Sequence, residues 1–233
     1  MSDERYALRR AEIETYFDRT AIDAWSRMTS DAPLTGIRAT VKEGRDRMRA
    51  TLLEWLPANL SGLRVLDAGC GTGLLAAEAA RRGGDIVAVD LSPNLVELGR
   101  ERLTPEGSGQ VEFRVGDMGD PGLGEFDYVV AMDSLIHYHA RDVVEVVARL
   151  AERTRQGILF TFAPKTLALT LKHAVGRAIP VRTQRAPAIE PVGERALTRR
   201  LVESQGLRDW RVGRTKRVSR GFYTSQAVEL MRF

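Results

Sequence analysis

Three glycines at alternate positions follow a short apolar run in VLDAGCGTG, residues 65–73. They are Gly69, Gly71 and Gly73, and Asp67 precedes them. Glycine leaves the backbone open to the close approach of a ligand. A dinucleotide site has G-x-G-x-x-G, whose amides bind a pyrophosphate at the start of a helix. The G-x-G-x-G spacing differs from this, and an acid ahead of it would repel a pyrophosphate but suits a cationic ligand.

An acid followed by G-x-G-x-G after a strand resembles the S-adenosylmethionine turn of class I methyltransferases. The resemblance implies that Asp67 reaches the ammonium of the methionine part, directly or through water. Asp90 ends the next expected strand and is placed to accept both ribose hydroxyls, because a carboxylate has two acceptor oxygens. Asp117, after the third strand, is placed for the adenine amino group, with a backbone amide from Met118. Two apolar residues would enclose the rings, Leu91 and Met132. We therefore expect S-adenosylmethionine as co-substrate, and we assign no metal-binding residue.

The stretch AMDSLIHYHA, residues 131–140, follows the fourth expected strand and bears on the methyl acceptor. Methyltransferases of exocyclic base nitrogens typically have [DNS]-P-P-[FY] there, so no nucleic-acid partner is expected. His137 is the best candidate to meet the acceptor, by taking a proton from a weak acid or by holding an anion when protonated. Its alternative role is to cap the following helix or to fill space. For His139 and His173 we favour a structural role.

Six stretches resemble the magnesium-protoporphyrin IX O-methyltransferase family, over almost the whole chain. They are YFDRTAIDAWSRM (16–28), IRATVKEGRDRMR (37–49), LLEWLPANLSGLRVLDAGCGTG (52–73), MDSLIHYH (132–139), FTFAPKT (160–166) and RVSRGFYTSQAVEL (217–230). The resemblance implies transfer of a methyl group to one propionate of Mg-protoporphyrin IX, in (bacterio)chlorophyll synthesis. A propionate is already ionised at neutral pH, so the reaction does not depend on a base.

The same resemblance implies which segment binds the substrate and which partners the protein contacts. A basic segment over 165–200 could form a lid and anchor the second propionate, with bidentate arginine as the natural device. Its cationic residues are Lys165, Lys172, Arg177, Arg182 and Arg185. The substrate partitions into membranes and is passed on from magnesium chelatase, so transient contacts with the chelatase and with the photosynthetic membrane are expected.

The N-terminal segment is expected to fold across the cofactor, as in other members of this class. Tyr16 would close the site or hydrogen-bond near the sulfonium, and Arg38 would pair with the methionine carboxylate. Tyr16 and Trp25 have an ordinary alternative as core residues, and Arg38 has one as a surface ion pair.

The hydrophobic pattern predicts strands that alternate with helices and position these residues. The strands are expected at 63–67, 85–90, 111–115, 126–133 and 156–164. The helices are expected at 4–17, 37–55, 73–82, 92–103, 141–154, 166–177 and 194–205. Ser92 is the expected cap of its helix, with Pro93 in the first position. Two further strands, WRVGRTKRV and FYTSQAVELMRF, are expected to close the sheet as an antiparallel pair.

These apolar strands predict a Rossmann-like α/β fold, with a mostly parallel seven-stranded sheet covered on both faces. We expect a helical arm or lid over 1–60 and an S-adenosylmethionine-binding domain over 61–233. Residues 165–205 would be a basic helical insertion on the substrate side, ahead of the last two strands.

The composition fits this interpretation: 233 residues, 43% apolar and 28% charged. Residues 165–220 hold 14 Lys and Arg against 4 Asp and Glu, a local net charge of +10 in a chain of +4. An anionic substrate, a lipid surface or nucleic acid would suit such a segment, and so would plain solvent exposure. A single cysteine, a charged N-terminal segment and no long apolar run predict a cytoplasmic location, with peripheral attachment to the photosynthetic membrane as a further expectation.

Two alternatives share every cofactor residue. One is methylation of a phenol or a quinone precursor, and the other is a non-catalytic module that binds S-adenosylmethionine.

Overall fold

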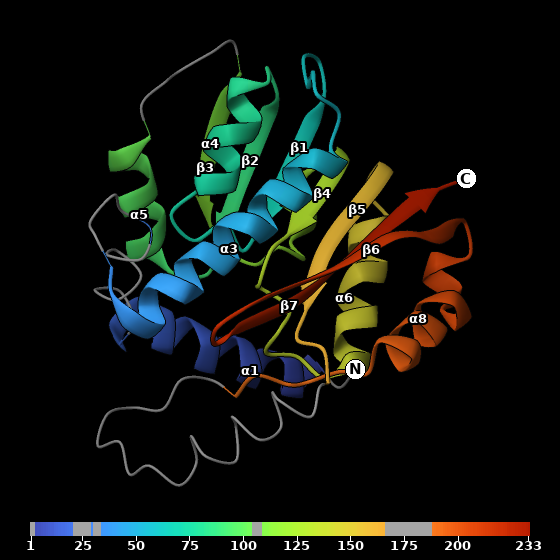
Figure 1. Cartoon of the computed structure of the whole chain (residues 1–233). Coiled ribbons are helices and arrows are strands. Elements are labelled where there is room, and N and C mark those ends of the chain that lie inside the picture. The colour runs from blue at the N-terminus through green and yellow to red at the C-terminus, as the bar shows by residue number, and fades with distance from the viewer. Residues whose placement is uncertain (1–2, 21–28, 30–33, 104–108, 166–187) are drawn as a thin grey trace, which may run out of the picture.

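The described residues fold around one sheet of seven strands (Figure 1). The computed structural model describes residues 3–20, 29, 34–103, 109–165 and 188–233. The strand order is β3-β2-β1-β4-β5-β7-β6. Five strands are parallel, namely β1 (Arg64–Ala68), β2 (Asp85–Asp90), β3 (Gln110–Val115), β4 (Phe126–Ala131) and β5 (Thr154–Phe162). β7 (Tyr223–Arg232) is antiparallel to β5 and to the edge strand β6 (Trp210–Arg220). The order therefore reverses between β1 and β4, where open α/β sheets bind ligands.

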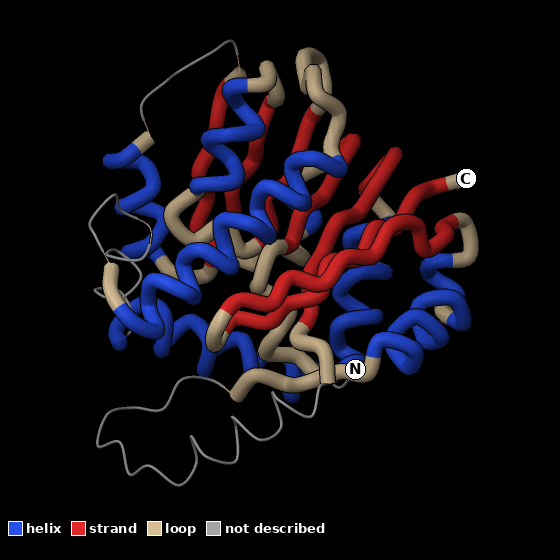
Figure 2. Tube along the Cα trace, in the orientation of Figure 1, coloured by secondary structure: helices blue, strands red, loops and turns tan. Residues whose placement is uncertain are grey.

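Helices cover both faces of this sheet (Figure 2). One face carries α3 (Gly36–Trp55), α4 (Leu74–Arg81) and α5 (Pro93–Arg102), and the other carries α6 (Ala140–Ala151) and α8 (Glu194–Glu203). α1 (Asp3–Thr15) continues into a π-helical turn, Tyr16–Thr20. Two short 3-10 turns, Pro121–Leu123 and Gln205–Leu207, complete the described helical elements.

The two hydrophobic layers arise from the alternation of side chains along each strand. In β1, Val65 packs among residues of α3 and α4, whereas its neighbour Leu66 packs among residues of α6 and α8. Both side chains are 0% exposed. A strand with both faces buried has no polar face, which explains why these strands appear in the sequence as continuous apolar runs.

The predicted fold class is confirmed: a mostly parallel, seven-stranded, Rossmann-like sheet with an antiparallel closing pair. The Ser92 hydroxyl accepts the Leu95 amide at 3.2 Å, so the predicted cap of α5 is also confirmed. The fourth strand was expected to reach residue 133 and instead ends at Ala131. The cause is Asp133, whose φ of 54° is left-handed and breaks the extended chain.

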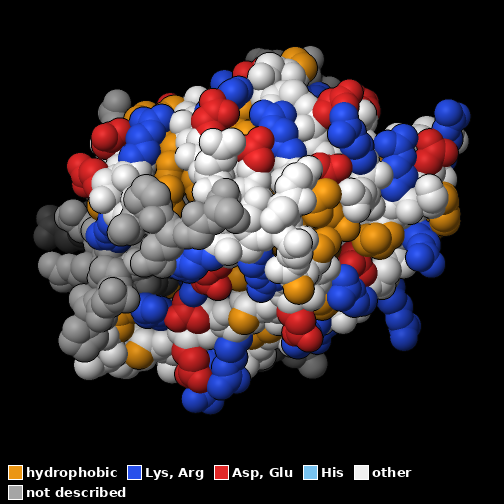
Figure 3. Space-filling view, turned by 90° about the horizontal axis from the view of Figure 1, so that it is seen from above, with side chains coloured by type: hydrophobic (Ala, Val, Ile, Leu, Met, Phe, Trp, Pro, Cys, Tyr) orange, Lys and Arg blue, Asp and Glu red, His pale blue; other side chains and the backbone are white. Residues whose placement is uncertain are grey.

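Part of the positive charge of residues 165–220 is offset by neighbouring acids. Arg217 pairs with Glu194 at 3.2 Å, and Arg220 pairs with Glu43 of α3 at 2.6 Å. Viewed from above, blue and red side chains are interspersed over that face of the molecule (Figure 3). The expected helix 166–177, Lys172, Arg177, Arg182, Arg185 and His173 lie outside the described residues, as does Trp25. Among the described helices, none is long and apolar enough to cross a bilayer.

Candidate active site

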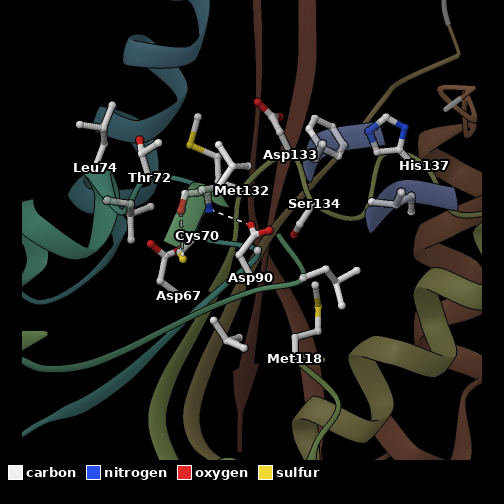
Figure 4. Close-up of a pocket in the computed structure, with 18 of the residues that line it drawn as sticks. Asp67, Cys70, Thr72, Leu74, Asp90, Met118, Met132, Asp133, Ser134 and His137 are labelled. Carbon is white, nitrogen blue, oxygen red and sulfur yellow. Dashed lines mark hydrogen bonds between the residues drawn. The ribbon is translucent and has the colours of Figure 1, made fainter. Parts of the chain in front are cut away.

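A cavity lined by described residues lies where the parallel strands end, and most of the predicted site residues line it. It encloses about 1160 Å³ of empty space, including the solvent at its mouth. Nine predicted residues line it: Asp67, Gly69, Gly71, Asp90, Leu91, Asp117, Met118, Met132 and His137. Three predicted residues, Gly73, Tyr16 and Arg38, are not among the lining residues. The close-up in Figure 4 shows residues from separate strand ends facing one space.

The glycine turn between β1 and α4 is left-handed at all three glycines, with φ of 82°, 55° and 73° at Gly69, Gly71 and Gly73. A Cβ on Gly69 would overlap the Ser134 side chain, and one on Gly73 would overlap the Phe113 ring. A Cβ on Gly71 would meet no atom within 4 Å. The first and third glycines therefore permit close packing, and Gly71 is the one that leaves space for a ligand. Gly73 is the N-cap of α4 and packs against the Phe113 ring, and its assignment to the cofactor stays a prediction.

Asp90 ends β2 directly beside the glycine turn. Its carboxylate accepts the Gly71 amide at 2.8 Å and the Ser92 amide at 3.0 Å. Burial raises the pKa of Asp90, and these backbone hydrogen bonds act in the opposite direction. The carboxylate is thus held rigidly at the centre of the cavity in Figure 4.

Asp67 is the most deeply buried acid of the cavity. Its residue is 2% exposed, and its carboxylate accepts the Ala76 amide of α4 at 3.2 Å. Burial raises the pKa of Asp67 to about 7, and the charge of Asp90 adds to this effect. A cation that arrived beside this group would favour its ionised form.

Asp117 is bound by the N-terminal helix, a contact that the sequence did not reveal. Its carboxylate accepts the Tyr6 hydroxyl and pairs with Arg10, each at 3.0 Å, and it accepts the Gly119 amide at 2.7 Å. Tyr6 also stacks on Tyr138 with ring centroids 5.6 Å apart. α1 therefore closes the end of the cavity at which adenine was expected.

In Figure 4, His137 lies across the cavity from Asp67 and Thr72, on the loop between β4 and α6. It is 7% exposed, and its ring meets Phe17 edge-on at a centroid distance of 5.8 Å. Its Nδ1 lies 3.4 Å from the carbonyl oxygen of Ala188. His139 is different, because its side chain is 63% exposed and faces Glu190 at 3.2 Å. Only the first of the two histidines is therefore placed to meet a ligand in the cavity.

Phe17, and not Tyr16, faces the cavity from the N-terminal segment. Ile13 lines the cavity too, and Phe17 follows it by four residues, or about one helical turn. Tyr16 precedes Phe17 by one position and packs edge-on against its ring at 5.2 Å. Its predicted role near the reacting groups stays a prediction, because Tyr16 is not among the described residues that line the cavity.

Arg38 is exposed at the start of α3, and other cations of that helix reach the cavity. Arg38 recurs at helical spacing with Lys42, Arg45 and Arg49, and these last three line the cavity. Arg49 donates to Glu78 at 2.6 Å and to Asp46 at 2.9 Å. The predicted Arg38 therefore shares a helix face with residues that line the cavity, but it lies at an earlier turn of α3.

Asp133 lines the cavity but was not among the residues predicted from the sequence. Its side chain is 4% exposed, and its carboxylate pairs with Arg45 at 2.8 Å. Three hydroxyls, from two neighbouring strands of the sheet, donate to the same carboxylate: those of Thr161, Tyr223 and Ser225. We call this group the Asp133 network. It joins α3, β5, β7 and the end of β4 immediately beside the cavity.

Comparisons with known proteins match almost the whole chain to methyltransferases. A family model described as "Magnesium-protoporphyrin IX methyltransferase C-terminus" matches residues 131–232, and one described as "Methyltransferase domain" matches residues 65–157. The chain is 49% identical over 225 residues to the magnesium-protoporphyrin O-methyltransferase of Rhodobacter capsulatus, which covers 96% of this chain and 97% of that one. It is 29% identical over 224 residues to the enzyme of the same name from Synechocystis, with 94% and 95% covered.

A solved structure shows the same likeness in three dimensions. The crystal structure of magnesium protoporphyrin IX methyltransferase from Synechocystis with bound SAH has a TM-score of 0.83 and 28% sequence identity. The superposed region covers 96% of this chain and 100% of that one.

Proposed function

The chain belongs to the magnesium-protoporphyrin O-methyltransferase family, and from this premise we propose that it methylates a propionate carboxylate of Mg-protoporphyrin IX. S-adenosylmethionine is the methyl donor, and the products are the monomethyl ester and S-adenosylhomocysteine. The observation that carries the proposal is the meeting of the glycine turn, Asp67, Asp90 and Asp117 in one cavity at the switch point of the sheet.

The residues present fit a sulfonium nucleoside. Gly71 leaves open space for a ligand, and Asp90 offers two oxygens to the ribose hydroxyls. Asp67 lies at the base of the turn for the ammonium, and Leu91 and Met132 line the cavity for the adenine rings. Asp117 and Met118 remain assigned to the adenine edge. For the methionine carboxylate we replace Arg38 with Arg49, which lines the cavity.

The proposed methyl transfer does not require a general acid or a general base. One oxygen–carbon bond forms and one sulfur–carbon bond breaks, and the electron pair of the broken bond returns to sulfur. The acceptor carboxylate is already ionised, so no proton has to leave it. The protein then contributes chiefly by holding the two reactants in line, which can supply about 7–11 kcal/mol of the barrier. We propose that His137 steers the reacting propionate, with Phe17 against the macrocycle.

The N-terminal arm, residues 1–60, would act as the lid of this site. The contacts that support this role are those of Tyr6 and Arg10 with Asp117, and that of Arg9 with the His137 carbonyl oxygen at 2.8 Å. The arm therefore touches both the adenine end and the acceptor end of the cavity. The second propionate remains assigned to the basic insertion, 165–205.

Cofactor affinity is expected to rise with pH through the titration of Asp67. Its pKa is about 7 because the carboxyl is buried, so at lower pH the group is neutral and attracts an ammonium less strongly. Binding of the cation must then release a proton, and the affinity should rise up to about tenfold per unit between about pH 5.5 and about pH 7. Calorimetry with S-adenosylmethionine in buffers of different ionisation enthalpy measures both effects. Asp67→Asn should bind more weakly and with little pH dependence over that range. A wild-type affinity that is flat from about pH 5.5 to about pH 7 would contradict the role of Asp67.

Replacing His137 with alanine should slow turnover about 10- to 100-fold without abolishing it, because the ionised acceptor needs positioning and no base. Single-turnover rates under saturating S-adenosylmethionine measure the effect. His139→Ala is the matched control, since that side chain is 63% exposed, and its rate should remain within about twofold of wild type. Complete loss of turnover in folded His137→Ala protein that still binds S-adenosylhomocysteine would indicate an obligatory proton transfer.

We also propose transient contacts with an anionic membrane surface and with magnesium chelatase. Phe222, whose apolar side chain is 53% exposed at the turn between β6 and β7, supports a surface contact. Flotation with vesicles of anionic lipid, compared with neutral lipid, tests the membrane part. Co-purification with the chelatase subunits tests the other.

The proposed reaction is tested by incubating the protein with labelled S-adenosylmethionine and Mg-protoporphyrin IX and measuring the mass of the pigment. A gain of one methyl group supports the proposal. A small phenol and a quinone precursor serve as competing acceptors, and methylation of one of these without methylation of the porphyrin would favour the alternative enzyme. Binding of the nucleoside with no transfer to any acceptor would favour the non-catalytic module.

A further inference from the structure

The side chain of Ser134 lines the cavity, and its hydroxyl has no hydrogen-bond partner among the described residues. Its Oγ is buried and makes no hydrogen bond with any described residue. The side chain nevertheless lines the cavity and, in Figure 4, extends into the space that Asp90 also faces. A buried hydroxyl without a partner costs free energy, and such an atom in a native structure indicates a missing partner.

The neighbours of Ser134 indicate which ligand would supply that partner. A Cβ on Gly69 would lie 3.1 Å from the Ser134 Oγ and 3.7 Å from Cε of Met118. Ser134 therefore packs on Gly69, the first glycine of the turn, and Met118 lies near the same glycine. Gly69 and Met118 are both assigned to the cofactor.

The Asp133 network fixes the direction of this side chain. Asp133 has a left-handed φ of 54°, and its amide donates to the Thr161 hydroxyl at 2.7 Å. Its carboxylate is held by Arg45 and by the three hydroxyls of the network. A non-glycine residue persists in this conformation only when its surroundings determine it. The peptide that leads into Ser134 is consequently held in one orientation, against the glycine turn.

We propose that Ser134 is a further cofactor-binding residue, whose hydroxyl hydrogen-bonds an oxygen or nitrogen atom in the ribose or methionine part of the bound sulfonium nucleoside. This inference rests on the proposed function. It assigns a role to a hydroxyl that the protein otherwise buries at a cost.

The test is to compare Ser134→Ala with wild type in two measurements, calorimetric titration with S-adenosylhomocysteine and thermal unfolding of the ligand-free protein. We expect the affinity to fall about 5- to 15-fold, the size of one lost hydrogen bond. The Tm of the ligand-free protein should stay the same or rise, because the substitution removes a polar atom that had no partner. Ser134→Cys keeps the size of the side chain, is a weak donor and should lose affinity in the same way.

Thr154→Val is the matched control, since Thr154 is 0% exposed and its hydroxyl donates to the Leu150 carbonyl oxygen at 2.6 Å. Here the Tm of the ligand-free protein should fall and the affinity should not change. An unchanged affinity for Ser134→Ala, or a Tm of its ligand-free form below that of wild type, would overturn the inference. A wild-type protein that fails to bind S-adenosylhomocysteine would instead refute the proposed function.

Discussion

Replacing Asp90 with alanine is expected to weaken the binding of S-adenosylhomocysteine by about 100-fold or more. Two hydrogen bonds from ribose hydroxyls to a buried carboxylate would be lost, each worth about 1.5–3 kcal/mol. The variant also leaves the Gly71 and Ser92 amides without the acceptor that they have at 2.8 Å and 3.0 Å. Calorimetric titration at neutral pH measures the affinity, and circular dichroism confirms that the variant is folded.

Asp85→Ala is the matched control for Asp90→Ala. It changes the same residue type in the same strand, at the end away from the cavity, where the Asp85 side chain is 45% exposed. Its affinity should equal that of wild type. If folded Asp90→Ala protein binds the nucleoside as tightly as wild type does, the assignment of the cofactor site to the end of β2 is wrong.

Replacing Asp133 with alanine is expected to lower the free energy of unfolding by about 3–5 kcal/mol. Asp133 is 4% exposed as a side chain and Arg45 is 21% exposed, so removing the carboxylate leaves a mostly buried guanidinium without this ion-pair partner. The hydroxyls of Thr161, Tyr223 and Ser225 lose their shared acceptor at the same time. Alanine also tolerates the left-handed conformation at this position poorly. Urea denaturation followed by circular dichroism measures the change.

An exposed ion pair provides the comparison for the Asp133 variant. Glu125 and Arg155 lie 2.7 Å apart, but their side chains are 67% and 63% exposed. Glu125→Ala should therefore change the free energy of unfolding by less than about 1 kcal/mol. A loss of stability in Asp133→Ala that is no larger than in Glu125→Ala would show that the network contributes little to the fold.

Features encoded within one local stretch could be predicted from the sequence. The glycine turn, the acids at successive strand ends and the cap at Ser92 each depend on neighbouring residues and on the rule that parallel strands end at one edge. The structure brings Asp67, Asp90 and Asp117 to one cavity accordingly. Local information was therefore sufficient to predict that these three acids lie together.

Features that depend on where one element crosses another could not be predicted. Arg38 shares a face of α3 with Arg45 and Arg49, but only the crossing of α3 over the sheet decides which turn of the helix meets the cavity. In the same way, the rotation of the π-helical turn Tyr16–Thr20 decides that Phe17 lines the cavity. The contact of Tyr6 with Asp117 joins residues 111 positions apart, and no local spacing encodes it.

The Asp133 network joins segments that lie far apart in the sequence. Arg45 comes from the stretch 37–49, Asp133 from 132–139 and Thr161 from 160–166. Tyr223 and Ser225 come from the tail stretch 217–230. These stretches are far apart in the chain and meet around one carboxylate in the fold. Five residues from four such stretches therefore form a single packed cluster beside the cavity.

Transfer of a methyl group to a carboxylate can be tested directly by the chemistry of the product. The protein is incubated with Mg-protoporphyrin IX and S-adenosylmethionine labelled in the methyl group, and the recovered pigment is then treated with mild alkali. A methyl ester releases its label as volatile methanol under these conditions, whereas a methyl ether or an N-methyl group retains it. We predict that the pigment gains one label per molecule and loses it to the volatile fraction. Label that stays on the pigment, or a pigment that gains none, would contradict carboxyl methylation by this protein.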